Sequence, residues 1–420
     1  LGKLGAIIRY IYSHFSYLLY RIWRLFMIIK LSSNNVKNYL INSGIYQQHN
    51  LESVNIDILE VIGSEIECSR IFFIRTLSDF NIVIKQEHYN YIDGIKNKVL
   101  NEWQLQKFLQ FTPGLDYTAS LCLEILQFDT NNSILIYKCP KYYFNLRDYY
   151  LKNKAFETKL AELLGISLAS LHKETMVNKE CHTFLNKSVG ETLCYEFPYP
   201  FYLREKITPE TFFISPSESM KFMKLYQRDE SMNKVVKKLI SDHNNYCLTN
   251  NSYCLDNILI PREWEDMLLH SKQFDNNLIK IINWDNCSWG DPAFDLGTVI
   301  ADYFSLWINS IFLHPALALN KSFQLAVIPL EAIQPSVLAL LRGYISKFPE
   351  IIQSYPCFLE RVIQFTGLGL IYKIITIINS FKGLNNQGIF ILNLSHKMLC
   401  DPENSLKSLL PNLTINSLVD

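Results

Sequence analysis

The chain has 420 residues, a hydrophobic fraction of 49%, and equal numbers of basic and acidic residues, 40 of each. This length and apolar content predict a folded protein with two domains, or one large domain in two lobes. The zero net charge gives no general reason to expect nucleic acid as a partner. Ten cysteines occur without the paired short spacings of zinc knuckles, so we expect reduced, buried thiols and a cytoplasmic protein.

The first 35 residues differ from the rest of the chain in charge. The first 50 residues carry six Lys or Arg and no Asp or Glu. Apolar residues recur on one face of a helical pattern here, and arginines interrupt the run of about 20 apolar residues that a membrane span needs. We predict a basic amphipathic helix over 1–30 and a linker to residue 35. Such a helix suits an anionic membrane interface, where it would give peripheral contact, or docking on protein, and both remain open.

Residues 36–138 predict a small β-rich lobe. A short helix begins near Val36, and runs of β-forming residues cover 54–62, 70–77 and 80–86. The turn pair Ser78-Asp79 between the last two runs indicates a hairpin. Lys85 closes the third run, and Glu102 lies in a helical stripe over 97–111. A lysine at a strand end is often only a solvated edge residue.

Residues 139–420 predict a second, mainly helical lobe. An apolar strand ends at Pro140 and a helix begins near Asn145. The pattern over 157–175 is that of an amphipathic helix, and we expect His172 to be a packed histidine near its end. Further helical stretches follow Gly297, bounded by Pro and Gly.

The stretch 248–297 organises the chain. It contains LTNNSYCLDNILI and, about twenty residues later, IKIINWDNCSWGDPAFDLG. Two short β-rich runs flank a loop, which predicts a small hydrophobic hairpin with polar side chains at its mouth.

This stretch resembles the signature of the aminoglycoside phosphotransferase-like, or protein-kinase-like, family. That signature is His-Gly-Asp, four residues and Asn, followed later by Asp-Trp-acid and Gly-Asp-Pro-x-x-Asp-Leu. The matching residues are Asn257, Trp284, Asp285, Gly290, Asp291, Pro292, Asp295 and Leu296. The chain departs from the signature where Asn250, Asn251 and Ser252 replace His-Gly-Asp, and where Asn283 replaces the Asp before Trp. A weaker likeness, over residues 392–411, is to the closing helix of phosphotransferase-like proteins of lanthipeptide-type biosynthesis.

The resemblance implies an α+β, bilobal protein-kinase-like fold that binds ATP with magnesium. It places Lys85 at the nucleotide phosphates with Glu102 as its partner, and backbone groups around Tyr137 and Cys139 at the adenine. It also implies three positions in the second lobe, which are Ser252 for the catalytic base and Asn257 and Asn283 for magnesium.

Two of these implied positions have lost a carboxylate. A serine hydroxyl at neutral pH is a poor base, and general acid–base catalysis contributes about 10²- to 10⁴-fold. The neutral Asn283 should weaken magnesium binding. Asp256 or Asp285 can stand in as the magnesium ligand, and Asp285 shares a face with Asn283 if the segment is a strand.

The two aspartates near Pro292 have a structural interpretation. Asp291 precedes the proline and suits a turn, and Asp295 suits a tether for the loop that holds Ser252. We favour structure over catalysis for both.

The sequence therefore predicts a degenerate kinase, or pseudokinase, that binds nucleotide weakly and acts as a scaffold or regulatory partner. The first alternative is an active ATP-dependent phosphotransferase on a small-molecule or peptide hydroxyl. The second is a membrane-associated adaptor that keeps the fold only for shape. Nothing in the sequence names the acceptor or the protein partner.

Overall fold

The computed structural model describes residues 29–45, 58–62, 69–76, 79–87, 98–187, 217–242, 246–270, 278–314, 316–355, 357–381, 384–411 and 413. Apart from its last two residues, the predicted basic helix over 1–30 lies outside this set. The chain forms two compact units, of which one takes Leu1–Trp103 and Glu124–Lys141 and the other takes Gln104–Leu123 and Tyr142–Asp420. None of the helices that the structure describes has the length and apolar content needed to cross a membrane.

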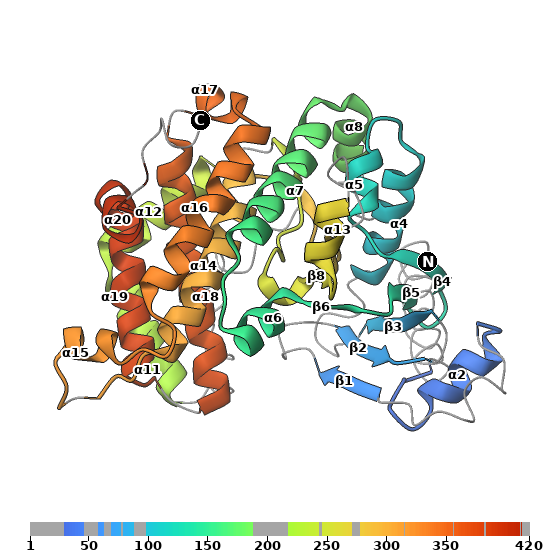
Figure 1. The fold of residues 1–420 in the computed structure, drawn as a ribbon, viewed down its shortest axis with the longest axis horizontal. Helices are drawn as coiled ribbons and strands as arrows, with labels where there is room; N and C mark the ends of the chain where they lie inside the picture. Colours follow the sequence, from blue (N-terminus) through green and yellow to red (C-terminus); the bar gives the residue numbers. More distant parts are fainter. Residues whose placement is uncertain are drawn as a thin grey trace, which may run out of the picture. The chain divides into compact units, whose positions relative to one another are not determined.

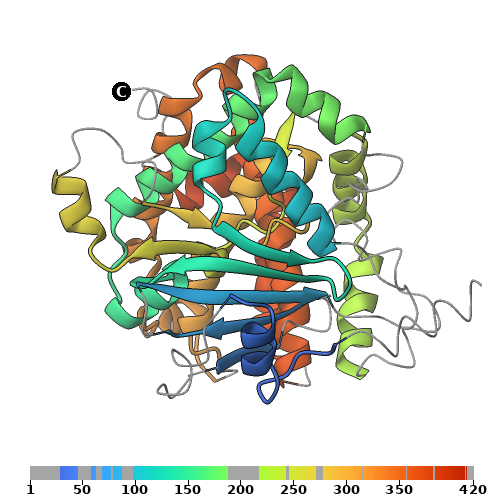
Figure 2. The same cartoon turned by 90° about the vertical axis from the view of Figure 1, so that its right-hand side faces the viewer.

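The first unit is built on one antiparallel sheet of five strands, whose blue and teal arrows lie one above another in Figure 2. The strands are β1 (Ile58–Ile62), β2 (Ser69–Ile74), β3 (Phe80–Glu87), β4 (Glu124–Asp129) and β5 (Ile134–Pro140), and their order is β1-β2-β3-β5-β4. Antiparallel pairing of β2 with β3 confirms the predicted hairpin.

One face of this sheet is covered by α2 (Val36–Asn42). Leu31, Val36 and Leu40 are fully buried with apolar side chains of β2, β3 and β5. The Leu31 N–H also donates to Gln86 Oε1 on β3 at 2.9 Å. The packed part of this unit therefore begins before residue 36.

The second unit is mainly helical, as Figure 1 shows. Its strands form two small antiparallel sheets, β6-β8-β9 and β7-β10. They are β6 (Tyr143–Asn145), β7 (Cys247–Thr249), β8 (Ile258–Pro261), β9 (Lys280–Ile281) and β10 (Ser288–Gly290), with the 3₁₀ turn η2 (Leu255–Asn257) before β8. The described helices are α5 (Asp116–Ser120), α6 (Leu146–Asn153), α7 (Thr158–Val177), α8 (Lys179–Lys187), α11 (Ser217–Arg228), α12 (Glu230–Ser241), α13 (Trp264–His270), α14 (Pro292–Ser310), α15 (Leu319–Gln324), α16 (Leu330–Lys347), α17 (Glu350–Ser354), α18 (Phe358–Phe381), α19 (Asn386–Cys400) and α20 (Pro402–Leu409).

Glycines allow α7 and α16 to pack closely side by side (Figure 1). A Cβ at Gly165 would overlap the Leu340 carbonyl oxygen, and one at Gly343 would overlap the Glu162 carbonyl oxygen. α14 packs against α18, which packs in turn against α19. This close packing fixes α7 and α14, the two helices that carry most of the buried polar residues described below.

The α+β prediction is confirmed, with a small β-rich unit and a larger helical one. α4 (Lys98–Phe111) is the predicted helix that carries Glu102, and the border between the units falls within it, between Trp103 and Gln104. The predicted hairpin of 248–297 differs from expectation in two ways. β8 pairs with β9 and β7 with β10, and the connection after β8 contains α13 rather than only a loop.

Candidate functional site

The β-rich unit contains a buried ion pair between β3 and α4. Lys85 Nζ lies 2.9 Å from Glu102 Oε2, and the two side chains are 3% and 2% exposed. Lys85 is held in the middle of the sheet, since it pairs with Ile71 on β2 and with Leu135 on β5. The alternative that this lysine is a solvated residue at a strand end is therefore wrong.

The two residues that the resemblance assigns to the adenine both lie on β5. Tyr137 pairs with Val83 on one side and Ile125 on the other, so its backbone groups lie inside the sheet. Cys139 pairs with Asn81 on β3, and no residue of β4 stands opposite it. Both side chains are buried, and burial raises the pKa of Cys139 to about 12.

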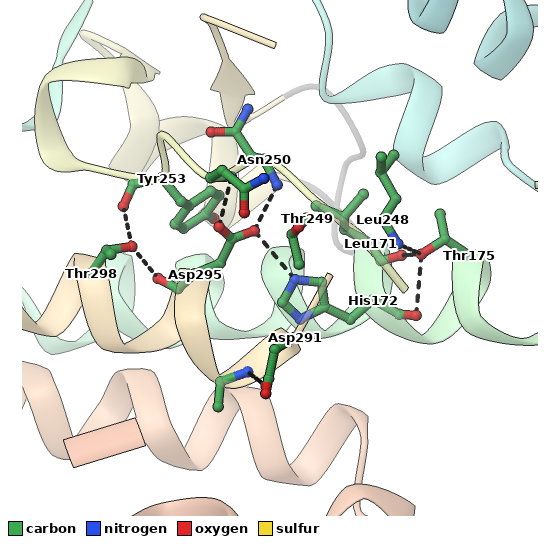
Figure 3. A network of polar contacts seen from close by, with 12 residues as sticks. Leu171, His172, Thr175, Leu248, Thr249, Asn250, Tyr253, Asp291, Asp295 and Thr298 are labelled. Carbon is green, nitrogen blue, oxygen red and sulfur yellow. Dashed lines mark hydrogen bonds and ion pairs between the residues drawn. The ribbon is translucent and has the colours of Figure 1, made fainter. Parts of the chain in front are cut away.

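In the helical unit, the residues that replace His-Gly-Asp form the loop between β7 and η2. Asp295 on α14 fixes the start of this loop, as Figure 3 shows. Its Oδ2 accepts from the Asn250 N–H at 2.7 Å, and its Oδ1 accepts from the Asn251 N–H at 2.9 Å. Asn251 has a φ of +57°, a left-handed conformation that asparagine tolerates. The predicted tether is confirmed.

Asp295 is supported by His172 on α7. His172 Nε2 lies 3.5 Å from Asp295 Oδ2 (Figure 3). Its Nδ1 lies 2.9 Å from the Tyr344 hydroxyl on α16. All three side chains are fully buried. His172 is thus a packed histidine, as predicted, and it lies next to the residue that anchors the loop.

The loop is held at further points by α14. Thr298 Oγ1 donates to the Tyr253 carbonyl at 3.2 Å, and Asp302 Oδ2 accepts from the Leu255 N–H at 2.8 Å. Asp295, Thr298 and Asp302 follow one another at spacings of three and four, which places them on one face of the helix. We call these three residues the α14 stripe. It fixes the backbone on both sides of Ser252.

Asp302 is fully buried between two cations. Lys373 Nζ on α18 lies 2.5 Å from its Oδ1, and Arg147 Nη2 on α6 lies 2.9 Å from the same atom. Burial by itself raises the pKa of Asp302, but Lys373 and Arg147 hold it below its ordinary value. Arg147 Nε also pairs with Asp256 Oδ2 at 2.8 Å. The carboxylate of Asp256 is therefore already balanced by an arginine, which argues against it as a substitute magnesium ligand.

Asp302 also belongs to the metal-ligand group that we find within the described part of the chain. Ligand atoms of Cys254, Asp256 and Asp302 lie within 4.8 Å of one another. Burial raises the pKa of Cys254 to about 12, which keeps the thiol protonated. Because Arg147 and Lys373 already balance both carboxylates, this group does not call for a metal.

Amide side chains surround Ser252. Asn257 Nδ2 donates to the Ser252 carbonyl at 2.8 Å, and Asn283 Nδ2 donates to Asn257 Oδ1 at 2.7 Å. Asn286 Nδ2 donates to Ser252 Oγ at 3.1 Å. The structure thus brings together Ser252, Asn257 and Asn283, the three positions that the resemblance assigns to the catalytic base and to magnesium.

Asn283 is not in a strand. β9 ends at Ile281, and Asn283 has a φ of +60°. The expectation that Asp285 shares a face with Asn283 therefore fails, because strand alternation does not apply to a left-handed residue. Asp285 lies in the turn that follows, with a half-buried side chain.

Asp291 begins α14 rather than joining the amides. Its Oδ1 accepts from the Ala293 N–H at 2.9 Å, so it caps the helix, and its Oδ2 pairs with Arg361 Nε at 2.6 Å. Burial raises the pKa of Asp291, although Arg361 opposes the shift. The structural interpretation of Asp291 is confirmed.

The amides do not fit a magnesium ion. Mg²⁺ prefers carboxylate oxygens in near-octahedral geometry. The two implied ligand positions, Asn257 and Asn283, offer no carboxylate, and Asn257 Oδ1 already accepts a hydrogen bond from Asn283.

No family model and no curated protein matches the sequence. Solved structures do match. A choline/ethanolamine kinase family protein from Mesorhizobium loti is 10% identical, with 92% of this chain and 99% of that chain covered and a TM-score of 0.46. The macrolide 2'-phosphotransferase MphH from Brachybacterium faecium is 13% identical, with 88% and 99% covered and a TM-score of 0.39. A glucosamine kinase solved with glucosamine, ADP and inorganic phosphate is 10% identical, with 85% and 82% covered and a TM-score of 0.44.

These neighbours are kinase-like phosphotransferases, the class that the sequence resemblance predicts. At 10% and 13% identity, the similarity concerns the fold alone.

Sequence reasoning missed Thr298, Asp302, Arg147 and Lys373. A signal was present in 292–308, because polar residues at a spacing of three and four interrupt an otherwise apolar helix. Their partners lie far away in the sequence, so the pattern alone does not show what they bind.

Proposed function

We propose that this chain is a degenerate kinase, which holds a nucleotide weakly and works as a scaffold or regulatory partner. One observation carries the proposal. The amide of Asn283 is hydrogen-bonded to Asn257 Oδ1 at 2.7 Å, at the two positions where the resemblance expects oxygen ligands for magnesium.

The chemistry of phosphoryl transfer explains why this matters. The protein contributes position and charge around the transferred group, and little covalent chemistry. Neutral amides supply no negative charge for a metal, and Ser252 Oγ, which accepts from Asn286, is no base at neutral pH. Loss of the base alone corresponds to about 10²- to 10⁴-fold in rate.

What remains supports nucleotide binding rather than catalysis. The Lys85–Glu102 pair is intact at 2.9 Å and buried, and it offers an oriented cation of the kind that kinases direct at phosphates. We expect the nucleotide to bind with little dependence on magnesium.

A thermal shift assay with ATP, run with magnesium and with EDTA, tests the proposal. A ligand that binds only the folded state stabilises it by about 2.7 kcal/mol at one hundred times its Kd. We expect a similar rise in Tm with ATP in both buffers and no ATP turnover. Turnover that depends on magnesium would overturn the proposal.

The matched variants follow from the buried ion pair. Lys85→Met alone leaves the Glu102 carboxylate buried without its partner, at a cost of about 3–5 kcal/mol. The double variant Lys85→Met with Glu102→Gln removes both charges, so it separates loss of binding from loss of folding. We expect the double variant to fold and to lose the response to ATP.

The active alternative, an ATP-dependent phosphotransferase on a small-molecule or peptide hydroxyl, requires Asp285 or Asp256 as the metal ligand. Because Arg147 already balances Asp256, Asp285 is the residue to test. Asp285→Asn would then abolish magnesium-dependent turnover. The adaptor alternative rests on residues 1–30, and flotation with anionic liposomes at low salt tests it on the full chain.

A further inference from the structure

We infer that the Asn257–Asn283 hydrogen bond holds this site in a form that needs no divalent cation, and that the single change Asn283→Asp makes the site cation-dependent. The inference rests on the proposed function only in taking 257 and 283 as the positions of the missing metal. It concerns the fold of the loop, so it is tested without nucleotide.

The direction of the hydrogen bond is set by the backbone of Ser252. Its carbonyl is an acceptor, so Asn257 must turn its NH₂ group towards it, at 2.8 Å. That choice leaves Asn257 Oδ1 facing Asn283. The side chain at 283 must therefore donate.

Asparagine meets this requirement and ionised aspartate does not. A carboxylate is acceptor-only, so Asp at 283 would place two oxygens opposite each other at the present separation of 2.7 Å. Two facing oxygen ligands are what a hard cation binds. The backbone tolerates the exchange, because both Asn and Asp are enriched among residues with the left-handed φ found here, +60°.

The rest of the loop is already held by groups that involve no cation. Asp295 accepts from the N–H groups of Asn250 and Asn251, and Asp302 accepts from the N–H of Leu255. A cation is therefore not required to order the backbone, and the wild-type chain should not respond to one.

A second position in the same network provides a matched control. Asn286 Nδ2 donates to Ser252 Oγ, and a hydroxyl can reverse its role and donate to a carboxylate. Asn286→Asp adds the same charge to the same network without forcing two acceptors together. We expect it to behave like the wild type.

The experiment measures Tm for the full chain, without nucleotide, in EDTA and in 10 mM Mg²⁺ or Ca²⁺. Asn283→Asp should melt roughly 2–8 °C below the wild type in EDTA, and the divalent cation should recover most of the loss. The wild type and Asn286→Asp should change little. The inference is wrong if Asn283→Asp has the same Tm as the wild type in EDTA, or if the cation raises the Tm of the wild type as much as that of the variant.

Asn283→Gly keeps the left-handed backbone without strain and removes the donor. It should lose stability without any cation response. If Asn283→Asp does not fold in either buffer, Asn283→Gly provides the test. A Tm of Asn283→Gly equal to that of the wild type would show that the Asn283 amide does not stabilise the loop. The proposed function fails on a different result, ATP turnover by the wild type.

Discussion

Asp295→Asn should weaken the helical unit by disturbing the start of the loop. The carboxylate accepts two backbone N–H groups, from Asn250 at 2.7 Å and from Asn251 at 2.9 Å. An amide of the same shape can accept one and must point its NH₂ group at the other. Hydrogen bonds to a charged group contribute about 1.5–3 kcal/mol each, and a buried unsatisfied donor costs about 1–3 kcal/mol. We expect a loss of about 2–4 kcal/mol.

Urea unfolding of the variant and the wild type measures this loss. Hydrogen exchange gives a local reading, in which the amides of Asn250 and Asn251 should lose protection before those of β7. Asp116→Asn is the control, since Asp116 is exposed in the first turn of α5 and should change stability by less than about 0.5 kcal/mol. If Asp295→Asn is no more destabilising than this control, the two hydrogen bonds between Asp295 and the loop do not contribute to stability as proposed.

Two further predictions concern buried contacts. Lys373 and Arg147 lower the pKa of Asp302 below its ordinary 3.8, so its contribution to stability is present above that pH and is lost as pH falls through the lower, folded-state pKa. Asp302→Asn should therefore be destabilised by about 3–5 kcal/mol at pH 7, and this deficit in urea melts should shrink as the pH falls below 3.8; a deficit that does not change with pH would contradict this. Gly165→Ala would drive its methyl group into the Leu340 carbonyl, and a loss below about 1 kcal/mol in the same assay would show that α7 and α16 can separate.

The sequence predicts a long-range contact where both partners belong to a motif whose residues come in a known order. The order of a strand lysine and a helix glutamate before the later signature predicts that Lys85 and Glu102 are partners, and their side chains meet at 2.9 Å. Asp295, the last Asp of the signature, is predicted to tether the loop that holds Ser252, and its carboxylate accepts from the N–H groups of Asn250 and Asn251. In these cases the motif carries the long-range contact that local periodicity cannot supply.

Where no motif helped, the local pattern failed for physical reasons. Strand alternation does not extend to Asp285, because the left-handed backbone at Asn283 interrupts it. Asp302 lies in an apolar helix, and a buried carboxylate is explained only by its cations, Lys373 and Arg147, which are distant in the sequence. The inserted helix α13 has no counterpart in the hairpin pattern.

The α14 stripe has a consequence for how this protein tolerates change. Its side chains hydrogen-bond to backbone N–H and C=O groups of the loop, which are present whatever the side chain is. None of these hydrogen bonds involves the Ser252 side chain. The side chain at position 252 can therefore be exchanged without loss of the contacts that hold the loop backbone. Introducing a carboxylate at Ser252 should therefore leave the loop backbone in place, because the three α14 contacts are all made to main-chain atoms of other residues.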